Sequence, residues 1–92
     1  FARVHPAQKL RIVAAFQPHL FTRTRDFADA FGRALAAADV AYLTEIYPAR
    51  EQPIPGVTAQ LIADAARGAG RAPAWQGTRD ALAAALAAGV RD

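Results

Sequence analysis

Residues 10–16 read LRIVAAF and residues 17–25 read QPHLFTRTR, and the fold is decided where the first stretch passes into the second. The apolar run is typical of a buried strand, and Pro18 stops the strand because proline has no amide hydrogen for the ladder. Thr24 or a neighbouring threonine can cap a helix that begins near Arg25. The sequence therefore predicts a strand over residues 10–16 that leads, through a polar loop, into a helix.

Helical and strand patterns alternate through the middle of the chain. After residue 25, apolar side chains recur at spacings of three and four, which predicts a helix over residues 25–38 with its inner stripe at Phe27, Phe31, Ala34, Leu35 and Ala38. Residues 40–46 are mostly apolar, as in a strand covered on both faces. Three prolines exclude regular structure from the loop over residues 47–56.

The last third of the chain repeats this alternation. Thr58 is expected to open a helix over residues 59–69, with its inner face at Leu61, Ile62, Ala65 and Ala69. Residues 74–76 form a short extended segment. Thr78 is expected to cap a third helix that ends near Gly89.

The order strand, helix, strand, helix, strand, helix defines the fold class. Short strands separated by helices imply right-handed crossovers and a parallel sheet. We therefore predict a three-layer, Rossmann-like α/β domain in which a mainly parallel sheet is flanked by helices. The chain has 92 residues, which suits one small domain.

Composition excludes several classes of function. The chain has no cysteine, which fits a cytoplasmic protein, and no stretch reaches the ~20 apolar residues that span a membrane. Its net charge is +3, but the arginines are scattered among acidic residues, which does not favour a nucleic-acid partner. The two histidines, His5 and His19, lack a metal-ligand spacing, and the chain contains neither a phosphate loop nor a serine. We therefore expect no metal site, no cofactor and no catalytic residue within this chain itself.

The loop after the first predicted strand is the candidate binding site. His19 and Arg23 lie at the carboxyl end of a strand and beside the start of a helix, where free amide N–H groups favour an anion such as a carboxylate or a phosphate. The alternative is a solvated turn in which Arg23 pairs with Asp26 or Asp29, a contact worth only ~0–1 kcal/mol.

A second loop follows the next predicted strand and is expected to lie beside the first. It contains Tyr47, Arg50 and Glu51. Pairing between Arg50 and Glu51 would make it a purely structural loop, whereas its position at a strand's carboxyl end favours contact with a ligand. Both interpretations remain open from the sequence.

Two sequence blocks resemble a known family. They are FQPH followed by TRT, in residues 16–24, and IYPAREQPIPGV, in residues 46–57. At this separation and on this order of elements they resemble the carboxy-terminal domain of the Mur ligases, in particular the UDP-N-acetylmuramate:L-alanine ligases. The resemblance runs from about Arg11 to Gly89. It implies that residues 1–92 are the amino-acid-binding domain of a three-domain enzyme and are inactive alone.

The resemblance implies an ATP-dependent acid–amino-acid ligase of cytoplasmic peptidoglycan precursor synthesis. In that family the lactyl carboxylate of UDP-N-acetylmuramate is phosphorylated with ATP and Mg²⁺, which the central domain mainly holds, and the amine of L-alanine then attacks. The partners it implies are these small molecules and the other domains of the same chain. By the resemblance, Arg23 would pair the alanine carboxylate, His19 would add a second donor, and Thr22 and Thr24 would orient the loop.

The chain departs from the family pattern at several points. Leu20 and Phe21 stand where arginine and tyrosine are commoner. The DYxHHPT block is not recognisable in residues 1–10, and the LGAGD block is missing, so we expect a truncated or partly ordered chain. A rival interpretation is a free-standing, small Rossmann-like module that binds an anion or a protein. A basic nucleic-acid binder is weaker, because no basic helix face is present.

Overall fold

A parallel sheet of three strands forms the middle layer of the computed structural model, which describes residues 11–89. The strands lie in the order β1-β2-β3, with Val13 opposite Val40 and Tyr42 opposite Trp75. In chain order the elements are β1 (Val13–Phe16), α1 (Phe21–Ala36), β2 (Val40–Thr44), α2 (Gln60–Gly68), β3 (Trp75–Gly77) and α3 (Arg79–Gly89). The predicted alternation and the parallel pairing are confirmed.

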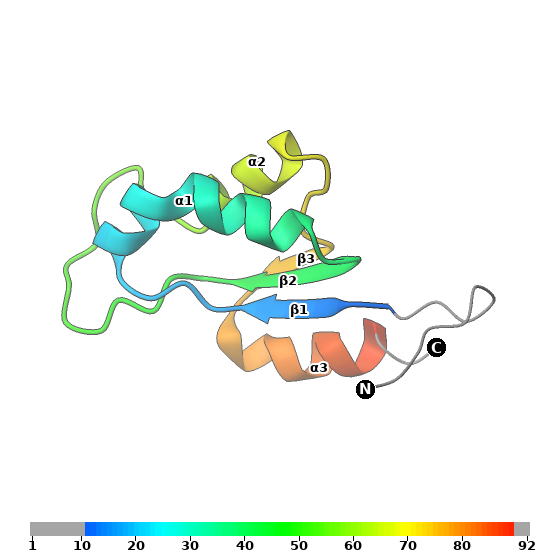
Figure 1. The fold of residues 1–92 in the computed structure, drawn as a ribbon. Coiled ribbons are helices and arrows are strands. Elements are labelled where there is room, and N and C mark those ends of the chain that lie inside the picture. Colours follow the sequence, from blue (N-terminus) through cyan, green and yellow to red (C-terminus); the bar gives the residue numbers. More distant parts are fainter. Residues whose placement is uncertain (1–10, 90–92) are drawn as a thin grey trace, which may run out of the picture.

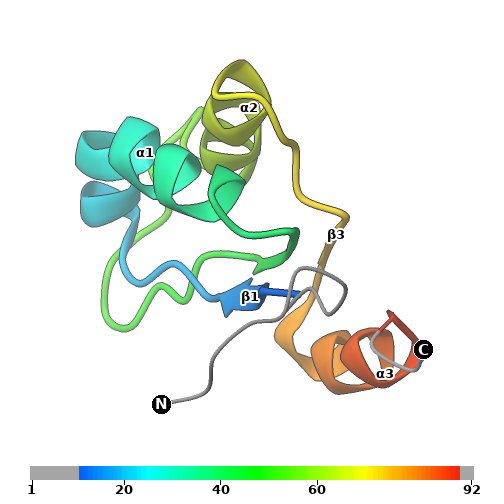
Figure 2. The ribbon, with the colours of Figure 1, turned by 45° about the vertical axis from the view of Figure 1, so that its right-hand side comes forward.

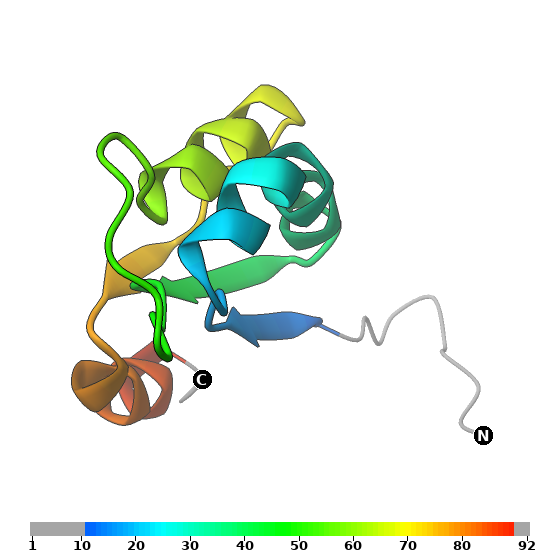
Figure 3. The ribbon, with the colours of Figure 1, turned by 90° about the vertical axis from the view of Figure 1, so that its left-hand side faces the viewer.

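The helices cover both faces of the sheet. Figure 1 shows α1 and α2 above the strands and α3 below them, and the turned view of Figure 2 shows the same separation. In the view turned by 90°, α1 and α2 lie side by side on one face of the sheet (Figure 3). The predicted three-layer, Rossmann-like arrangement is therefore confirmed.

The core lies between the sheet and the pair α1 and α2. Leu43 and Ile62 are fully buried there, beside Leu35, and the partly buried Ala14 and Phe16 pack against them. Fully burying a side chain such as leucine or isoleucine stabilises a fold by about 1.5–3 kcal/mol. The central strand contributes Ala41 and Leu43 to this core, and its other face is covered as well, because every residue from Ala41 to Thr44 is buried. This matches the apolar composition that predicted a strand covered on both faces.

The first two strands are shorter than the sequence predicts. The first was expected over residues 10–16 but begins at Val13, and residue 10 lies outside the described part of the chain. Ile12, the residue directly before the first strand, donates its amide to the Asp39 carboxylate over 2.7 Å. The second strand ends at Thr44 instead of residue 46, and the third lies one residue later than predicted.

Helix α1 differs most from the prediction. It begins at Phe21 and ends at Ala36, whereas residues 25–38 were expected. Phe27 was expected in the inner stripe, but its φ of −122° and ψ of 17° kink the helix. The kink leaves Phe27 53% exposed, and Ala34 is exposed as well. Phe31 stays partly buried and contacts Phe16 with ring centroids 5.0 Å apart.

The second helix begins at Gln60, one residue later than expected, and the third begins at Arg79, directly after Thr78 as expected. The Gln60 amide donates to the Thr58 hydroxyl over 3.2 Å, and the Ala81 amide donates to the Thr78 hydroxyl over 3.3 Å. The inner face of α2 is rotated relative to the prediction, because Ile62, Ala63 and Ala66 are the buried residues and Ala69 is exposed. No helix within residues 11–89 combines the length and hydropathy that a bilayer crossing demands.

Candidate functional site

The loops that follow β1 and β2 are joined at the carboxyl end of the sheet. The Tyr47 amide donates to the Pro18 carbonyl over 2.8 Å, and the Leu20 amide donates to the Tyr47 carbonyl over 2.9 Å. Between these bonds the rings of His19 and Tyr47 stack, with centroids 5.5 Å apart and planes 20° apart. Figure 1 shows the loop after β2 beside the start of α1. The two segments that the sequence nominated therefore form one surface.

Glu51 binds the amino terminus of α1. Its Oε1 atom accepts the Phe21 amide over 2.6 Å and the Thr22 amide over 3.1 Å. Its Oε2 atom accepts the Thr22 hydroxyl over 2.5 Å. The first amides of a helix have no partner within the helix, and the helix dipole favours an anion beside them. Glu51 thus supplies the anion that these amides require.

The charge of Glu51 is stabilised by this arrangement. The hydroxyl of Thr22 contributes most to lowering the pKa of the carboxyl group from its ordinary value of 4.5. Partial burial opposes the change, whereas the amides of Thr22 and Phe21 and the charge of Arg25 add to it. Hydrogen bonds donated to a carboxylate favour its charged form. Glu51 is therefore an anion in the folded protein at neutral pH.

The two threonines of the first loop have different roles from those expected. Neither caps α1 from outside, since the helix already begins at Phe21 and the capping position is Leu20. Thr24 is fully buried, and its hydroxyl donates to the Leu20 carbonyl over 3.0 Å, which braces the first turn from within. Thr22 instead faces Glu51. The prediction of a threonine cap for α1 is therefore wrong.

The arginines of the site are exposed. Arg23 lies on the first turn of α1, and Arg50 lies in the turn after Pro48. A surface ion pair between Arg23 and Asp26 was the alternative. Asp26 pairs instead with Arg25, which donates to it over 2.9 Å. Glu51 bonds to α1 and not to Arg50. Among the described residues, the structure brings together His19, Tyr47, Thr22 and Glu51, and places Arg23 next to them on the helix.

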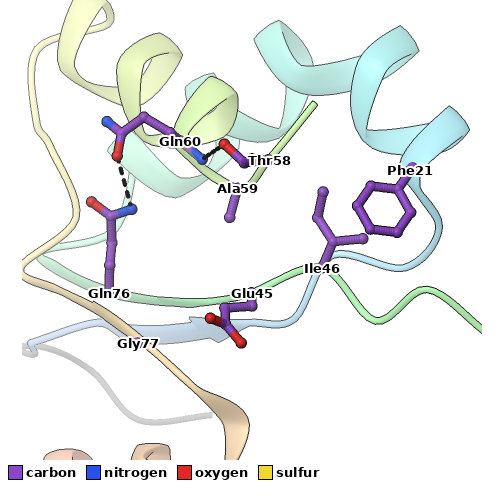
Figure 4. A pocket seen from close by; sticks show the side chains of 8 residues that line it. All are labelled: Phe21, Glu45, Ile46, Thr58, Ala59, Gln60, Gln76 and Gly77. Carbon is purple, nitrogen blue, oxygen red and sulfur yellow. Dashed lines mark hydrogen bonds between the residues drawn. The ribbon is translucent and has the colours of Figure 1, made fainter. Parts of the chain in front are cut away.

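A cavity of about 500 Å³ lies beside this surface (Figure 4). It is formed at the ends of β2 and β3 and at the start of α2, and Phe21 is the residue it shares with the first loop. In Figure 4 the amide groups of Gln60 and Gln76 point toward one another, and they are joined by a hydrogen bond of 3.4 Å. The lining residues are Phe21, Glu45, Ile46, Thr58, Ala59, Gln60, Gln76 and Gly77. This cavity was not predicted from the sequence, where the loop after β3 was interpreted only as a helix cap.

Comparison with known proteins places the chain in a family. No protein-family model matches it. The UDP-N-acetylmuramate–L-alanine ligase of Cutibacterium acnes is 53% identical over 81 residues, which are 88% of this chain and 17% of that ligase. The ligases of the same name from Chlorobium chlorochromatii and Pelodictyon phaeoclathratiforme are 58% identical over 65 residues and 61% identical over 62 residues, covering 14% and 13% of their lengths.

These matches and the parallel α/β fold define the class, since the chain matches one part of the Mur ligases. The resemblance seen in the two sequence blocks is therefore confirmed. Within that class, the chain belongs to the UDP-N-acetylmuramate–L-alanine ligase family. It spans less than a fifth of the length of the curated relatives it matches.

Proposed function

We propose that this chain is the carboxy-terminal, amino-acid-binding domain of a ligase that joins L-alanine to UDP-N-acetylmuramate in the cytoplasm. The observation that carries the proposal is 53% identity over 81 residues to a ligase of that name. The fold supports it, because the joined loops lie at the carboxyl ends of parallel strands, where α/β proteins bind their ligands.

Within this domain, Arg23 is the residue proposed to bind the alanine carboxylate, with His19 as a second donor. Arg23 is exposed on the first turn of α1, four residues after His19, so its guanidinium is accessible to a ligand. Its planar group can pair a carboxylate through two parallel hydrogen bonds. Thr22 and Thr24 act on the backbone that carries these side chains, and Tyr47 supports the His19 ring.

ATP and Mg²⁺ are assigned to another part of the full-length ligase. Within residues 11–89, no three His, Asp or Glu side chains gather where they could share a metal ion. The sequence also lacks the GxxxxGK[ST] loop that cradles phosphates. The proposed contribution of this domain is therefore to bind and orient the amino acid, and we expect the domain alone to be inactive.

Steady-state kinetics of the full-length ligase, with alanine varied at saturating ATP and UDP-sugar, test this proposal. A shielded, charge-assisted contact is worth about 1.5–3 kcal/mol, so Arg23→Ala should raise the KM for alanine about ten- to hundredfold. Arg23→Lys should recover part of the loss, because lysine keeps the charge but not the fork. Arg33→Ala, at an exposed arginine near the other end of α1, is the matched control. Equal effects of Arg23→Ala and Arg33→Ala would remove Arg23 from the site.

A further inference from the structure

The anion position at the start of α1 is already filled by the chain's own carboxylate. Glu51 accepts both the Phe21 and Thr22 amides, at 2.6 Å and 3.1 Å, and it accepts the Thr22 hydroxyl with its second oxygen. The lowered pKa of Glu51 agrees with this geometry. A substrate carboxylate cannot use the same two amides while Glu51 holds them.

The backbone immediately before these amides is held in an uncommon conformation. Leu20 has φ 72° and ψ 138°, a region that residues other than glycine rarely adopt. Its amide is fixed by the Tyr47 carbonyl, and its carbonyl accepts the Thr24 amide over 3.1 Å. Such a conformation persists only where its surroundings determine it. The bonds from the loop after β2 supply part of that constraint.

We infer that Glu51 is a positioning residue for the amino-acid site. By filling the start of α1, it fixes the first turn that carries Arg23 and ties the turn to the loop that supports His19. The carboxylate of the amino acid is thereby directed away from the helix amides and toward the Arg23 and His19 side chains. This inference rests on the proposed function, because it concerns the residues assigned there to alanine.

Kinetics of the full-length ligase test the positioning role. Glu51→Ala should raise the KM for alanine about ten- to hundredfold, since misplacing a binding group by an ångström has effects of that size. The KM values for ATP and the UDP-sugar should stay within about twofold, because other parts of the ligase hold those substrates. Acetate, as a free carboxylate, should refill the vacated position and restore part of the alanine affinity. Gln52→Ala, at the exposed neighbouring residue, is the matched control and should change none of these values.

Two results would overturn the inference. One is a KM for alanine within about twofold of the wild-type value in Glu51→Ala. The other is a parallel rise in the KM values for all three substrates that acetate does not reverse. That result would show that Glu51 serves only the stability of the fold.

An activity-free measurement separates this inference from the proposed function. In NMR spectra of the chain, the amide proton signals of Phe21 and Thr22 should titrate with the Glu51 carboxyl group and shift upfield in Glu51→Gln. Unchanged signals would refute the occupancy of the helix start, whatever the enzyme does. A wild-type ligase without alanine-dependent activity would refute the proposed function, whereas the NMR result would still decide where Glu51 binds.

Discussion

The contact between α1 and α2 depends on a glycine, and Gly32→Ala tests how closely the two helices approach. Gly32 is buried on the face of α1 that meets α2. A Cβ atom built at Gly32 would collide with the Cβ of Ala65. It would also lie 2.6 Å from the amide nitrogen of Ala66 and 2.8 Å from the carbonyl carbon of Ala65. Backbone atoms cannot rotate away as a flexible side chain can, so the helices have to separate.

The expected loss of stability follows from two opposing effects. Overpacking a core costs about 1–3 kcal/mol, and the backbone clash at Gly32 favours the upper end of that range. Replacing glycine by alanine inside a helix returns about 1 kcal/mol. The net loss for Gly32→Ala is then about 2 kcal/mol, which lowers the Tm of a domain of this size by about 8–16 °C.

Thermal unfolding followed by circular dichroism measures this loss. Gly68→Ala is the matched control, because Gly68 is also helical and a Cβ there meets nothing within 4 Å. Its Tm should stay equal or rise, owing to helix propensity alone. If Gly32→Ala is as stable as Gly68→Ala, the helices do not approach as closely as the structure indicates, and the reasoning fails.

Three further predictions concern strain, charge and the core. Leu20→Gly should unfold at a higher temperature than Leu20→Ala, because glycine relieves the positive φ that alanine retains. The pKa of Glu51 is lowered in the fold, so its stabilising effect is present above pH 4.5 and is lost as the pH falls through the folded pKa. The wild-type Tm should therefore fall more steeply on acidification than that of Glu51→Gln. Ile62→Ala should lose about 2–5 kcal/mol in urea unfolding, because Ile62 is fully buried.

Local patterns explain why much of the fold was predictable from the sequence. The apolar run of β2 and the threonines Thr58 and Thr78 act within a few residues of themselves, so their structural effect can be predicted without knowing the rest of the chain. The order of strands and helices then leaves few topologies, because parallel crossovers are right-handed. His19 and Tyr47 were both nominated for the same reason, since each follows a strand whose carboxyl end lies at the same edge of the sheet.

The features that escaped prediction depend on contacts between distant segments. The hydrogen bond from Phe21 to Glu51 joins residues 30 positions apart, and nothing in either segment alone indicates it. It supplies the partner that allows α1 to begin before the expected threonine cap. The kink at Phe27 also rotates the inner stripe of α1, although the spacing of apolar residues was regular. At the start of α1, the tertiary contact with Glu51 overrode the local preference.

The start of α1 was expected to attract a substrate anion, because a helix amino terminus favours negative charge. Whether a substrate or the protein itself supplies that anion depends on the whole fold. An anion does lie on the first amides of α1, as the helix dipole favours. Its source is internal, because β1 and β2 are parallel neighbours and their loops leave the sheet about 4.8 Å apart. Glu51, on the loop after β2, is therefore held at high effective concentration beside α1, which follows the loop after β1. An external anion has to compete with the Glu51 carboxylate. Under the proposed function, we therefore expect a substrate carboxylate at this surface to bind side chains other than the helix amides, of which Arg23 is exposed on the same turn.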